Sequence, residues 1–405
     1  MSLRVNFFSN APFVPTGYGN QTKLTVPRLR NLGHELSISA FYGTQGGITA
    51  FDGMMVYPQH RHPYGQDMIG AHAEHAKADI IITLMDAWVV QPENIPPSIE
   101  WHPYFPIDCE PVPGAVLREI VKGKKPITMS KFGLHQMQNA GIDAYYAPHM
   151  VDTKVFKPMD RVEARNLMGL PLDKFIVGMV AANKGAPPRK AFFEQIAAFA
   201  AFKQEHKDAI LYLHTDDGTH GGEVVNLVKY CQIMGLKVGY FKGMNIPVDD
   251  VDVIFVDQYS NAIGLPDPYM VALYNSLDVM MLVSMGEGFG IPLIEAQACG
   301  CPVITGDWTA MGELCFSGWK IAKTEATPEW HSFFEAWQWR TSVEAVVKRL
   351  IAAYEVRGNQ DYRDRARDGA RMYDCDRVIE KYWKPILEDI EANLHKGSAF
   401  EEALK

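Results

Sequence analysis

The sequence predicts an α/β protein with more than one doubly wound domain. A chain of 405 residues is long enough for two or three domains that each bury a core. The order strand, glycine-rich loop, helix and strand occurs over residues 3–41 and again over residues 279–304. A hydrophobic content of 47% with 21% charged residues is ordinary for a globular protein, which fits such domains.

The stretch over residues 279–304 has the clearest local pattern. An apolar run at its start has the length of a buried strand. Pro292 suits the first turn of a following helix, where a missing N–H has no consequence, and Gly300 suits the position just after that helix. The loop between strand and helix contains alternating glycines, which open backbone conformations closed to other residues (Gly286, Gly288 and Gly290).

Two glutamates frame this loop, Glu287 within it and Glu295 in the predicted helix. A helix start has unsatisfied N–H groups and partial positive charge, so it favours an anion such as phosphate. One glutamate facing a sugar and the other facing a ribose, with phosphates between them on the amides, would form a nucleotide-sugar site. The pattern alone equally allows an ordinary strand–turn–helix unit whose glutamates are solvated.

Composition excludes several other classes. The net charge of −9 argues against a general binder of nucleic acid or other polyanions. No segment approaches the ~20 continuous apolar residues that span a bilayer. The first residues run directly into a strand, so we expect a cytoplasmic protein, with peripheral association at a membrane left open. The six cysteines show no Cys-x2-Cys spacing, which predicts reduced core residues rather than structural zinc.

The first domain opens with the strand–loop–helix–strand order of residues 3–41. Its helix runs to about Leu32, and Pro27 should kink or bound it. Gly17 and Gly19 lie in the loop before it, rich in turn formers. They do not complete the dinucleotide-binding fingerprint, and an ordinary turn also explains them.

The rest of the first domain contains one candidate ligand edge. Residues 41–70 are expected to form an irregular loop, and the histidines there and shortly after it lack zinc spacing and predict a surface cluster (His60, His62, His72 and His75). A buried-type strand over 78–84 is followed by Asp86 and Trp88, at the carboxyl edge where open α/β sheets place ligands. Asp86 either faces a ligand or caps the next turn, and Trp88 offers a wall for sugar rings.

The second domain opens with a strand over 175–181 and a basic loop. Arg189 and Lys190 precede a helix, with Lys184 a few residues earlier, and would set donors and positive charge beside a phosphate. A solvated charge cluster is the plain alternative. The chain after Leu314 is expected to be helical, and its aromatic residues to pack on an insertion rather than bind carbohydrate (Trp330, Phe333, Phe334, Trp337 and Trp339).

The string Gly-Glu-Gly-Phe-Gly-Ile-Pro-Leu-Ile-Glu-Ala over residues 286–296 resembles the Glu-x7-Glu signature of retaining GT-B glycosyltransferases, specifically glycosyltransferase family 4. The resemblance covers nearly the whole chain. It implies an α/β GT-B architecture of two Rossmann-like domains facing a central cleft. The implied ranges are an acceptor-side domain over 1–165, a nucleotide-sugar-binding domain over 166–375, and a terminal helix over 376–405 that crosses back to the first domain.

The resemblance also implies roles for residues of the second domain. Lys190 and a basic partner would hold the donor diphosphate; we take Arg189 as that partner and Lys184 as the alternative. Glu287 would hold sugar hydroxyls and steady the anomeric centre, and Glu295 would grip the ribose.

Further residues are implied at the donor or at the reacting centre. The donor-binding set extends to loop residues of both domains (Gly17, Gly19, Gly288, Phe289, Gly290 and Thr309). Family members carry a histidine near Met85–Asp86 that contacts the transferred sugar. Here Asp86 is the nearest polar group, and we take it as a catalytic residue beside Glu287 and Lys190.

The resulting hypothesis is a retaining, metal-independent glycosyltransferase without a cofactor, acting by front-face attack with a UDP- or GDP-sugar donor. The acceptor (a glycan, lipid, small molecule, protein or modified base) and the oligomeric state are left open. Residues 250–252 match the metal-binding Asp-x-Asp of another glycosyltransferase architecture, but strand-like flanks argue against that use. The alternatives are a sugar phosphorylase or epimerase of the same fold, and a non-catalytic nucleotide- or carbohydrate-binding protein, which the missing histidine supports.

Overall fold

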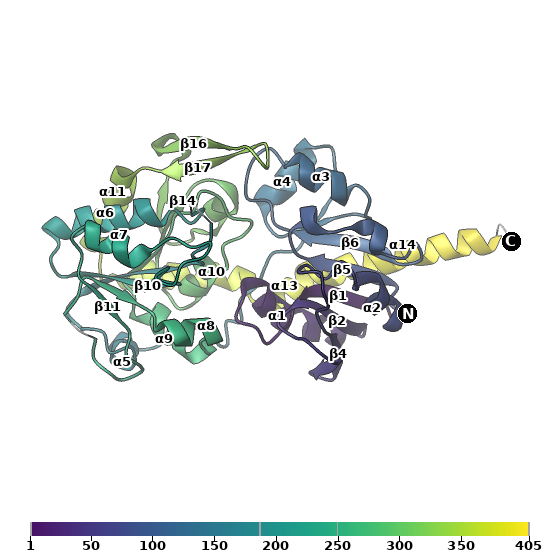
Figure 1. Cartoon of the computed structure of the whole chain (residues 1–405), viewed down its shortest axis with the longest axis horizontal. Coiled ribbons are helices and arrows are strands. Elements are labelled where there is room, and N and C mark those ends of the chain that lie inside the picture. The colour runs from purple at the N-terminus through teal and green to yellow at the C-terminus, as the bar shows by residue number, and fades with distance from the viewer. Residues whose placement is uncertain (1, 186–187, 249, 404–405) are drawn as a thin grey trace. The chain divides into compact units, whose positions relative to one another are not determined.

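The computed structural model describes residues 2–185, 188–248 and 250–403. The chain forms two compact units, each with its own sheet and flanking helices (Figure 1). The first unit contains residues 1–150, 333–335 and 373–405, and the second contains residues 151–332 and 336–372. Among the described residues, no helix is both long and apolar enough to cross a bilayer.

The first unit is built on an eight-stranded sheet of order β3-β4-β2-β1-β5-β6-β7-β8. Every pairing is parallel except the hairpin of β3 with β4. Its central strands are largely buried because helices cover both faces of a parallel sheet; six of the seven residues of β1 and all five of β5 are buried. The strands are β1 Arg4–Asn10, β2 Glu35–Tyr42, β3 Thr49–Phe51, β4 Met54–Tyr57, β5 Ile80–Leu84, β6 Glu100–Phe105, β7 Ile127–Thr128 and β8 Tyr145–Tyr146.

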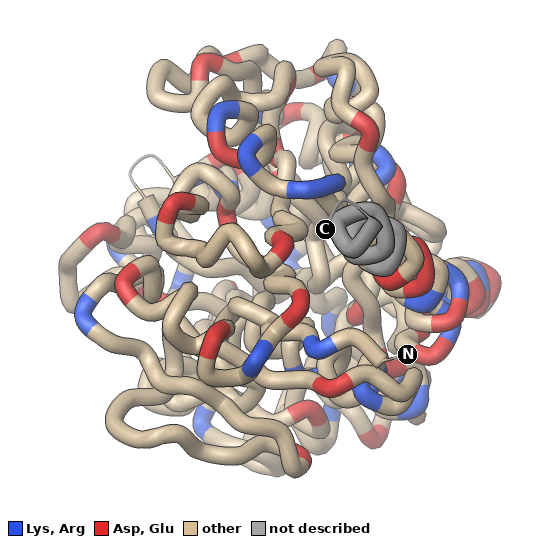
Figure 2. Tube along the Cα trace, turned by 90° about the vertical axis from the view of Figure 1, so that its right-hand side faces the viewer, with Lys and Arg blue, Asp and Glu red and all other residues tan. Residues whose placement is uncertain are grey.

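The helices of the first unit come from both ends of the chain. They are α1 Gly17–Asn31, α2 Ile69–His75, α3 Gly114–Ile120, α4 Lys131–Asn139, α13 Cys375–Val378 and α14 Lys384–Ala403. Trp383, in the π-helical turn between α13 and α14, is fully buried and packs edge-on against Tyr104 of β6, with ring centroids 5.2 Å apart. The C-terminal segment therefore contributes to the core of the first unit. Figure 2 shows charged residues of both signs along α14.

Two expectations about the first unit need correction. Residues 41–70 contain the β3–β4 hairpin, which extends the sheet and is not an irregular loop. The four histidines are not one surface cluster: His72 is buried and stacks on Tyr57 at 4.8 Å, and His75 Nδ1 lies 2.9 Å from the Tyr57 hydroxyl. The contacts of His72 and His75 with Tyr57 of β4 join segments that are not adjacent in sequence, so local composition does not reveal them.

The second unit is built on a seven-stranded, all-parallel sheet of order β11-β12-β10-β9-β13-β14-β15. Its strands are β9 Phe175–Val180, β10 Ala209–His214, β11 Val238–Tyr240, β12 Val253–Phe255, β13 Val279–Leu282, β14 Val303–Gly306 and β15 Gly318–Ile321. Its helices are α5 Arg161–Leu167, α6 Phe192–Glu205, α7 Leu227–Ile233, α8 Gln258–Ile263, α9 Asp267–Ser276, α10 Ile291–Ala298, α11 Val343–Glu355 and α12 Gln360–Ala370.

The expectation that the chain is helical after Leu314 is wrong for residues 318–341. This segment contains β15 and an antiparallel hairpin of β16 Ala326–His331 and β17 Ala336–Thr341. Trp330 and Trp337 are cross-strand partners with ring centroids 5.0 Å apart, a pairing that stabilises a two-stranded ribbon.

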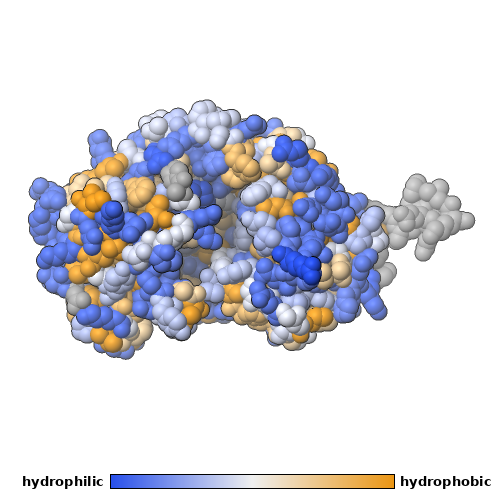
Figure 3. All heavy atoms as spheres, viewed as in Figure 1, coloured by the Kyte–Doolittle hydropathy of each residue, from blue (hydrophilic) through white to orange (hydrophobic). Residues whose placement is uncertain are grey.

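On the molecular surface shown in Figure 3, apolar residues are scattered among polar ones.

Candidate functional site

The loop and helix after β13 form as the sequence predicts. Helix α10 begins at Ile291 with Pro292 in its first turn, and Gly300 follows its end with φ 77°. Of the three loop glycines, only Gly290 has a positive φ, 110°. The prediction that all three supply unusual backbone conformations is thus wrong for Gly286 and Gly288; these are buried, as is the whole loop from Ser284.

Glu287 is the electrostatic centre of this loop. It is 6% exposed, and its carboxylate contacts Lys190 Nζ and lies 3.4 Å from Arg189 Nη1. Ser284 Oγ donates to it at 2.6 Å. Burial acts to raise its pKa, but the charges of Lys190 and Arg189 and the hydrogen bonds outweigh burial and lower the pKa to about 2. Glu287 is therefore ionised throughout the neutral range.

Arg189 and Lys190 lie just before α6, in a segment that is hydrogen-bonded to the loop containing Glu287. Arg189 donates to the Gly286 carbonyl, and the Arg189 carbonyl accepts from Met285 N at 2.8 Å. Ala191, the residue between Lys190 and α6, is left-handed at φ 49° although it is not glycine. Such strained conformations cluster at functional sites. Ala186 and Pro187 of the preceding loop lie outside the described residues.

Gln195 is a supporting residue that the sequence reasoning missed. Its side chain is fully buried, donates to the Lys190 carbonyl at 2.7 Å, and accepts from Val283 N at 3.0 Å. It thereby ties the backbone of the basic loop to the end of β13. The available signal was an amide on the otherwise apolar face of α6, since a buried amide needs hydrogen-bond partners.

A third loop, which contains residues 308–310, is hydrogen-bonded to Glu287 and Ser284. Thr309 Oγ1 accepts from Glu287 N at 3.1 Å, and Ala310 N donates to the Glu287 carbonyl at 3.3 Å. Thr309 has φ 50°, which is uncommon for a β-branched residue. Trp308 Nε1 donates to the Ser284 carbonyl at 3.0 Å. Residues 308–310, distant in sequence, therefore fix the backbone of the loop that carries Glu287.

Glu295 lies in a different environment. It is partly exposed on α10, and Tyr274 of α9 donates a hydrogen bond of 2.8 Å to its Oε2. Burial raises the pKa of Glu295 to about 7, and the Tyr274 hydrogen bond only partly opposes this. The two glutamates of one motif therefore titrate far apart.

The remaining second-unit candidates have clear places. Phe289 is buried beside the loop, whereas Lys184 is exposed. Arg189 rather than Lys184 thus partners Lys190 at Glu287. Asp252 of the Asp-x-Asp string bonds Lys203 at 2.8 Å and accepts from Lys237 N.

One group in the described part of the chain has side-chain ligand atoms close enough for a metal ion: Asp216, Asp217 and His220, after β10. The Asp217 carboxylate accepts from Thr219 N at 2.8 Å and from the Tyr240 hydroxyl at 2.7 Å. These bonds account for Asp217 as a residue that orders its loop.

The first-unit candidates are described separately. Gly19 N donates to Thr16 Oγ1 at 3.0 Å, and a Cβ at Gly19 would lie 2.4 Å from the Val14 carbonyl, so packing already requires glycine there. Gly17 is the first residue of α1 and Gly19 also lies in this helix, so the expectation that both lie in the loop before it is wrong. Asp86 is exposed after β5, and its side chain makes no capping bond to the next turn. Their participation in a donor site stays a prediction.

A family model described as Glycosyl transferases group 1 matches residues 262–316, which include the loop, α10 and Thr309. D-inositol 3-phosphate glycosyltransferase of Paenarthrobacter aurescens is 27% identical over 161 residues, covering 39% of this chain and 33% of the relative. Lipopolysaccharide core biosynthesis mannosyltransferase LpsB of Rhizobium meliloti is 26% identical over 254 residues, covering 56% of this chain and 64% of the relative. The chain thus spans about a third of the length of the first of these relatives.

Solved structures match over nearly the full length. Sucrose-phosphate synthase of Thermosynechococcus elongatus has a TM-score of 0.70 at 14% identity, with 96% of this chain and 99% of that chain covered. Anabaena HepE in complex with UDP-glucose has a TM-score of 0.63 at 13% identity, covering 95% and 99%. Two Rossmann-like α/β units with parallel sheets, matched over their whole length by such structures, identify the architecture of this chain as the GT-B fold.

Proposed function

We propose that this chain is a retaining glycosyltransferase that moves a sugar from a nucleotide-diphosphate-sugar to an acceptor hydroxyl. The observation that carries the proposal is the buried Glu287 carboxylate. It is held by Lys190 and Arg189 and lies in the loop just before α10. This cluster lies in and beside the segment similar to the Glycosyl transferases group 1 family. Similarity to D-inositol 3-phosphate glycosyltransferase and to the mannosyltransferase LpsB supports the same activity class.

Lys190 and Arg189 would receive the donor diphosphate. They are partly exposed and precede α6, and the positive end of the helix dipole at the start of α10 favours an anion. As the bond between sugar and diphosphate breaks, negative charge grows on the leaving phosphate. Fixed cations and amides stabilise that charge without reorganising, which is commonly the largest contribution to such a reaction. Two basic side chains in this place provide the charge that a metal ion would otherwise supply, so we propose metal-independent transfer.

Glu287 would both hold the cations and face the sugar. Its low pKa keeps it anionic, so it can accept hydrogen bonds from sugar hydroxyls and stabilise positive charge at the anomeric carbon. Glu295 accepts a hydrogen bond from Tyr274, and its pKa lies well above that of Glu287. These properties suit a ribose contact rather than the role of second carboxylate in a double displacement. Retention by front-face attack therefore remains our proposal for the stereochemistry.

UDP is the first donor nucleotide to test, because the structurally similar HepE was solved with UDP-glucose, and GDP is the second. Thermal unfolding with UDP, GDP and ADP should raise the melting temperature with one of them by mass action. Glu295→Gln should reduce that rise, whereas the exposed Lys184→Gln should leave it unchanged. If no nucleoside diphosphate stabilises the protein, the donor-site proposal fails.

A second assay tests turnover. The donor for this assay is the UDP- or GDP-sugar that contains the stabilising nucleotide. NMR of the product should show the same anomeric configuration as the donor, in the presence or absence of EDTA. Donor binding without release of nucleoside diphosphate, across glycan, lipid and small-molecule acceptors, would favour the non-catalytic alternative. Release with phosphate as acceptor would favour a phosphorylase, and an altered sugar without transfer an epimerase.

A further inference from the structure

A basic pocket lies at the opposite edge of the second-unit sheet from Glu287. Asp278 directly precedes β13 and Pro302 directly precedes β14, so the pocket is at the amino ends of these parallel strands. The Glu287 loop follows the carboxyl end of β13. The pocket is a shallow depression that opens to solvent, lined by residues of α5, α11 and α12 and by these strand ends. It is therefore separate from the candidate donor site.

Positive charge exceeds negative charge in this pocket. Arg161, Arg357 and Arg363 line it, with Asp278 as the lining carboxylate. Arg165 also bonds Asp278, at 2.7 Å, and both residues are nearly buried. Arg161 and Arg165 share the single Asp278 carboxylate and Arg363 lines the same pocket, so positive charge is in local surplus although the chain has a net charge of −9.

The Asp278 carboxylate is already fully engaged. Its Oδ1 bonds Arg161 Nη2 at 2.5 Å, and its Oδ2 accepts from Arg165 Nη2 and from Ile176 N, both at 2.7 Å. Among the residues that the structure describes, the buried Arg161 Nε group has no hydrogen-bond acceptor. An unsatisfied buried donor of this kind needs an explanation such as a bound water or ion.

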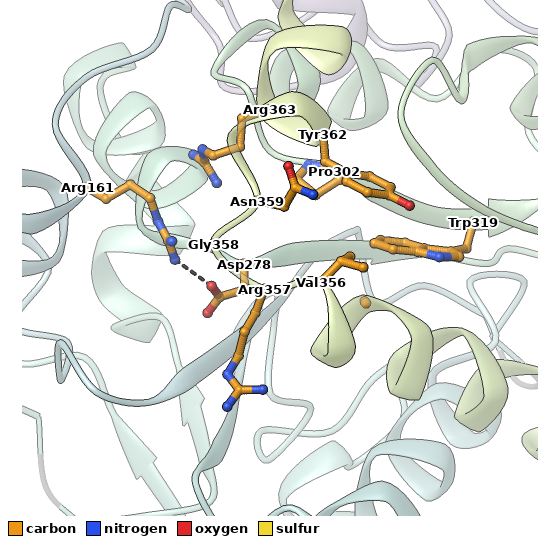
Figure 4. A pocket seen from close by; sticks show the side chains of 11 residues that line it. Arg161, Asp278, Pro302, Trp319, Val356, Arg357, Gly358, Asn359, Tyr362 and Arg363 are labelled. Carbon is orange, nitrogen blue, oxygen red and sulfur yellow. Dashed lines mark hydrogen bonds and ion pairs between the residues drawn. The ribbon is translucent and has the colours of Figure 1, made fainter.

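Within the described part of the chain, the hydrogen-bond partners of Arg363 are neutral. Its guanidinium donates to the carbonyls of Leu277 at 3.1 Å and Asn275 at 3.4 Å. Burial lowers its pKa, and the neighbouring charge of Arg161 adds to that lowering. In Figure 4, Arg161 and Arg363 reach toward the same space beside Asp278, whereas Arg357 extends away from it.

The other walls suit a small ligand with a phosphate group. The rings of Trp319 and Tyr362 stack at 5.3 Å and form one side (Figure 4). Asn359 caps the start of α12 by accepting from Asp361 N at 2.9 Å, so the first turn of an eleven-residue helix lines the hollow. A helix start favours an anion, in agreement with the arginines.

We propose that this pocket binds a phosphate group through Arg161 and Arg363, either as orthophosphate or as a phosphate monoester, at a second site independent of the nucleotide sugar. Guanidinium forks match the oxygens of phosphate, and the unsatisfied Arg161 Nε would gain an acceptor. The bound anion would also balance the surplus charge around Asp278.

Calorimetric titration with sodium phosphate at neutral pH and fixed ionic strength tests this site. The background variant is Lys190→Gln, which weakens phosphate binding at the candidate donor site. This protein should bind one phosphate, and adding Arg363→Gln should weaken binding by at least about tenfold, the effect of losing a charged hydrogen bond. The matched control Arg371→Gln, just after α12 and 61% exposed, should change nothing. Titration with glycerol phosphate in parallel distinguishes a monoester site from an orthophosphate site.

Two results would overturn the proposal: no phosphate binding by the Lys190→Gln protein, or equal binding after Arg363→Gln. Circular dichroism checks that each variant is folded. If Arg363→Gln is not, Arg161→Gln replaces it, because Asp278 then keeps its bond to Arg165. UDP or GDP binding should be the same with and without Arg363→Gln, so failure of this site and failure of the donor site are separate outcomes.

Discussion

Glu287 and Glu295 belong to one short motif, yet the tertiary structure gives them opposite electrostatic properties. Glu287 is surrounded by Lys190, Arg189 and the Ser284 hydroxyl, and its pKa is about 2. Glu295 has a tyrosine hydroxyl as its partner, and its pKa is about 7. Burial acts on both; the charged partners decide the difference. The motif therefore places two carboxylates in one short segment, while their protonation states depend on side chains brought from other elements.

The largest expected effect is on transfer by Glu287→Gln. The isosteric amide keeps the shape but removes the charge that fixes Lys190 and that we propose faces the anomeric centre. We expect the transfer rate to fall by about 10²–10³-fold, as for loss of one electrostatic stabiliser of a transition state. Glu295→Gln should mainly raise the KM for the donor. Initial rates of both variants with the donor identified by thermal unfolding check this; equal kcat losses would contradict distinct roles.

Lys190→Met should be the most destabilising of these variants. It leaves the buried Glu287 carboxylate with Arg189 as its remaining cation. Removing one partner of a buried ion pair costs about 3–5 kcal/mol, and the partial exposure of Lys190 reduces our expectation to about 2 kcal/mol. Urea unfolding at neutral pH measures the change. The control Lys184→Met, at an exposed position, should stay within about 0.5 kcal/mol.

The pH dependence of stability should separate the two glutamates. The folded pKa of Glu287 lies below its unfolded value of about 4.3, so its contribution is present above that pH and is lost as pH falls toward about 2. The folded pKa of Glu295 lies above its unfolded value, so its contribution is present below about pH 4.3 and is lost as pH rises through about 7. Relative to wild type, Glu295→Gln should gain stability between about pH 5 and pH 8. Urea unfolding across that range checks the sign, and a flat difference would contradict it.

The smallest effect is expected for Tyr274→Phe. It removes the one hydroxyl that stabilises the Glu295 carboxylate, so the pKa of Glu295 should rise further and stability should fall by about 1 kcal/mol at high pH. If the ribose bonds ionised Glu295, nucleotide binding releases a proton, and affinity should increase as pH rises through about 7 in the wild type. In Tyr274→Phe that increase should move to higher pH, and in Glu295→Gln it should disappear. Calorimetry in buffers of different ionisation enthalpy measures the proton release.

Local pattern predicted the central strands and the unit from β13 to β14 well. The apolar run before Ser284, Pro292 and Gly300 act over a few residues each, and the structure places them at a strand, a helix start and a helix end. Prediction failed over residues 318–341, where the aromatic side chains pair across a hairpin. A pairing between strands leaves little trace in the helical periodicity of either strand.

The sequence by itself determined the α/β class, the motif of Glu287 and Glu295, and the basic loop of Arg189 and Lys190, because these depend on short-range propensity and composition. Only the tertiary structure decided that Lys190 meets Glu287 at a sequence separation of 97 residues, and that Gln195 joins the two segments. It also gathered Arg161, Asp278 and Arg363 into one pocket. Such contacts form when parallel strands align their ends at a common edge, and no local pattern encodes which distant ends will be neighbours.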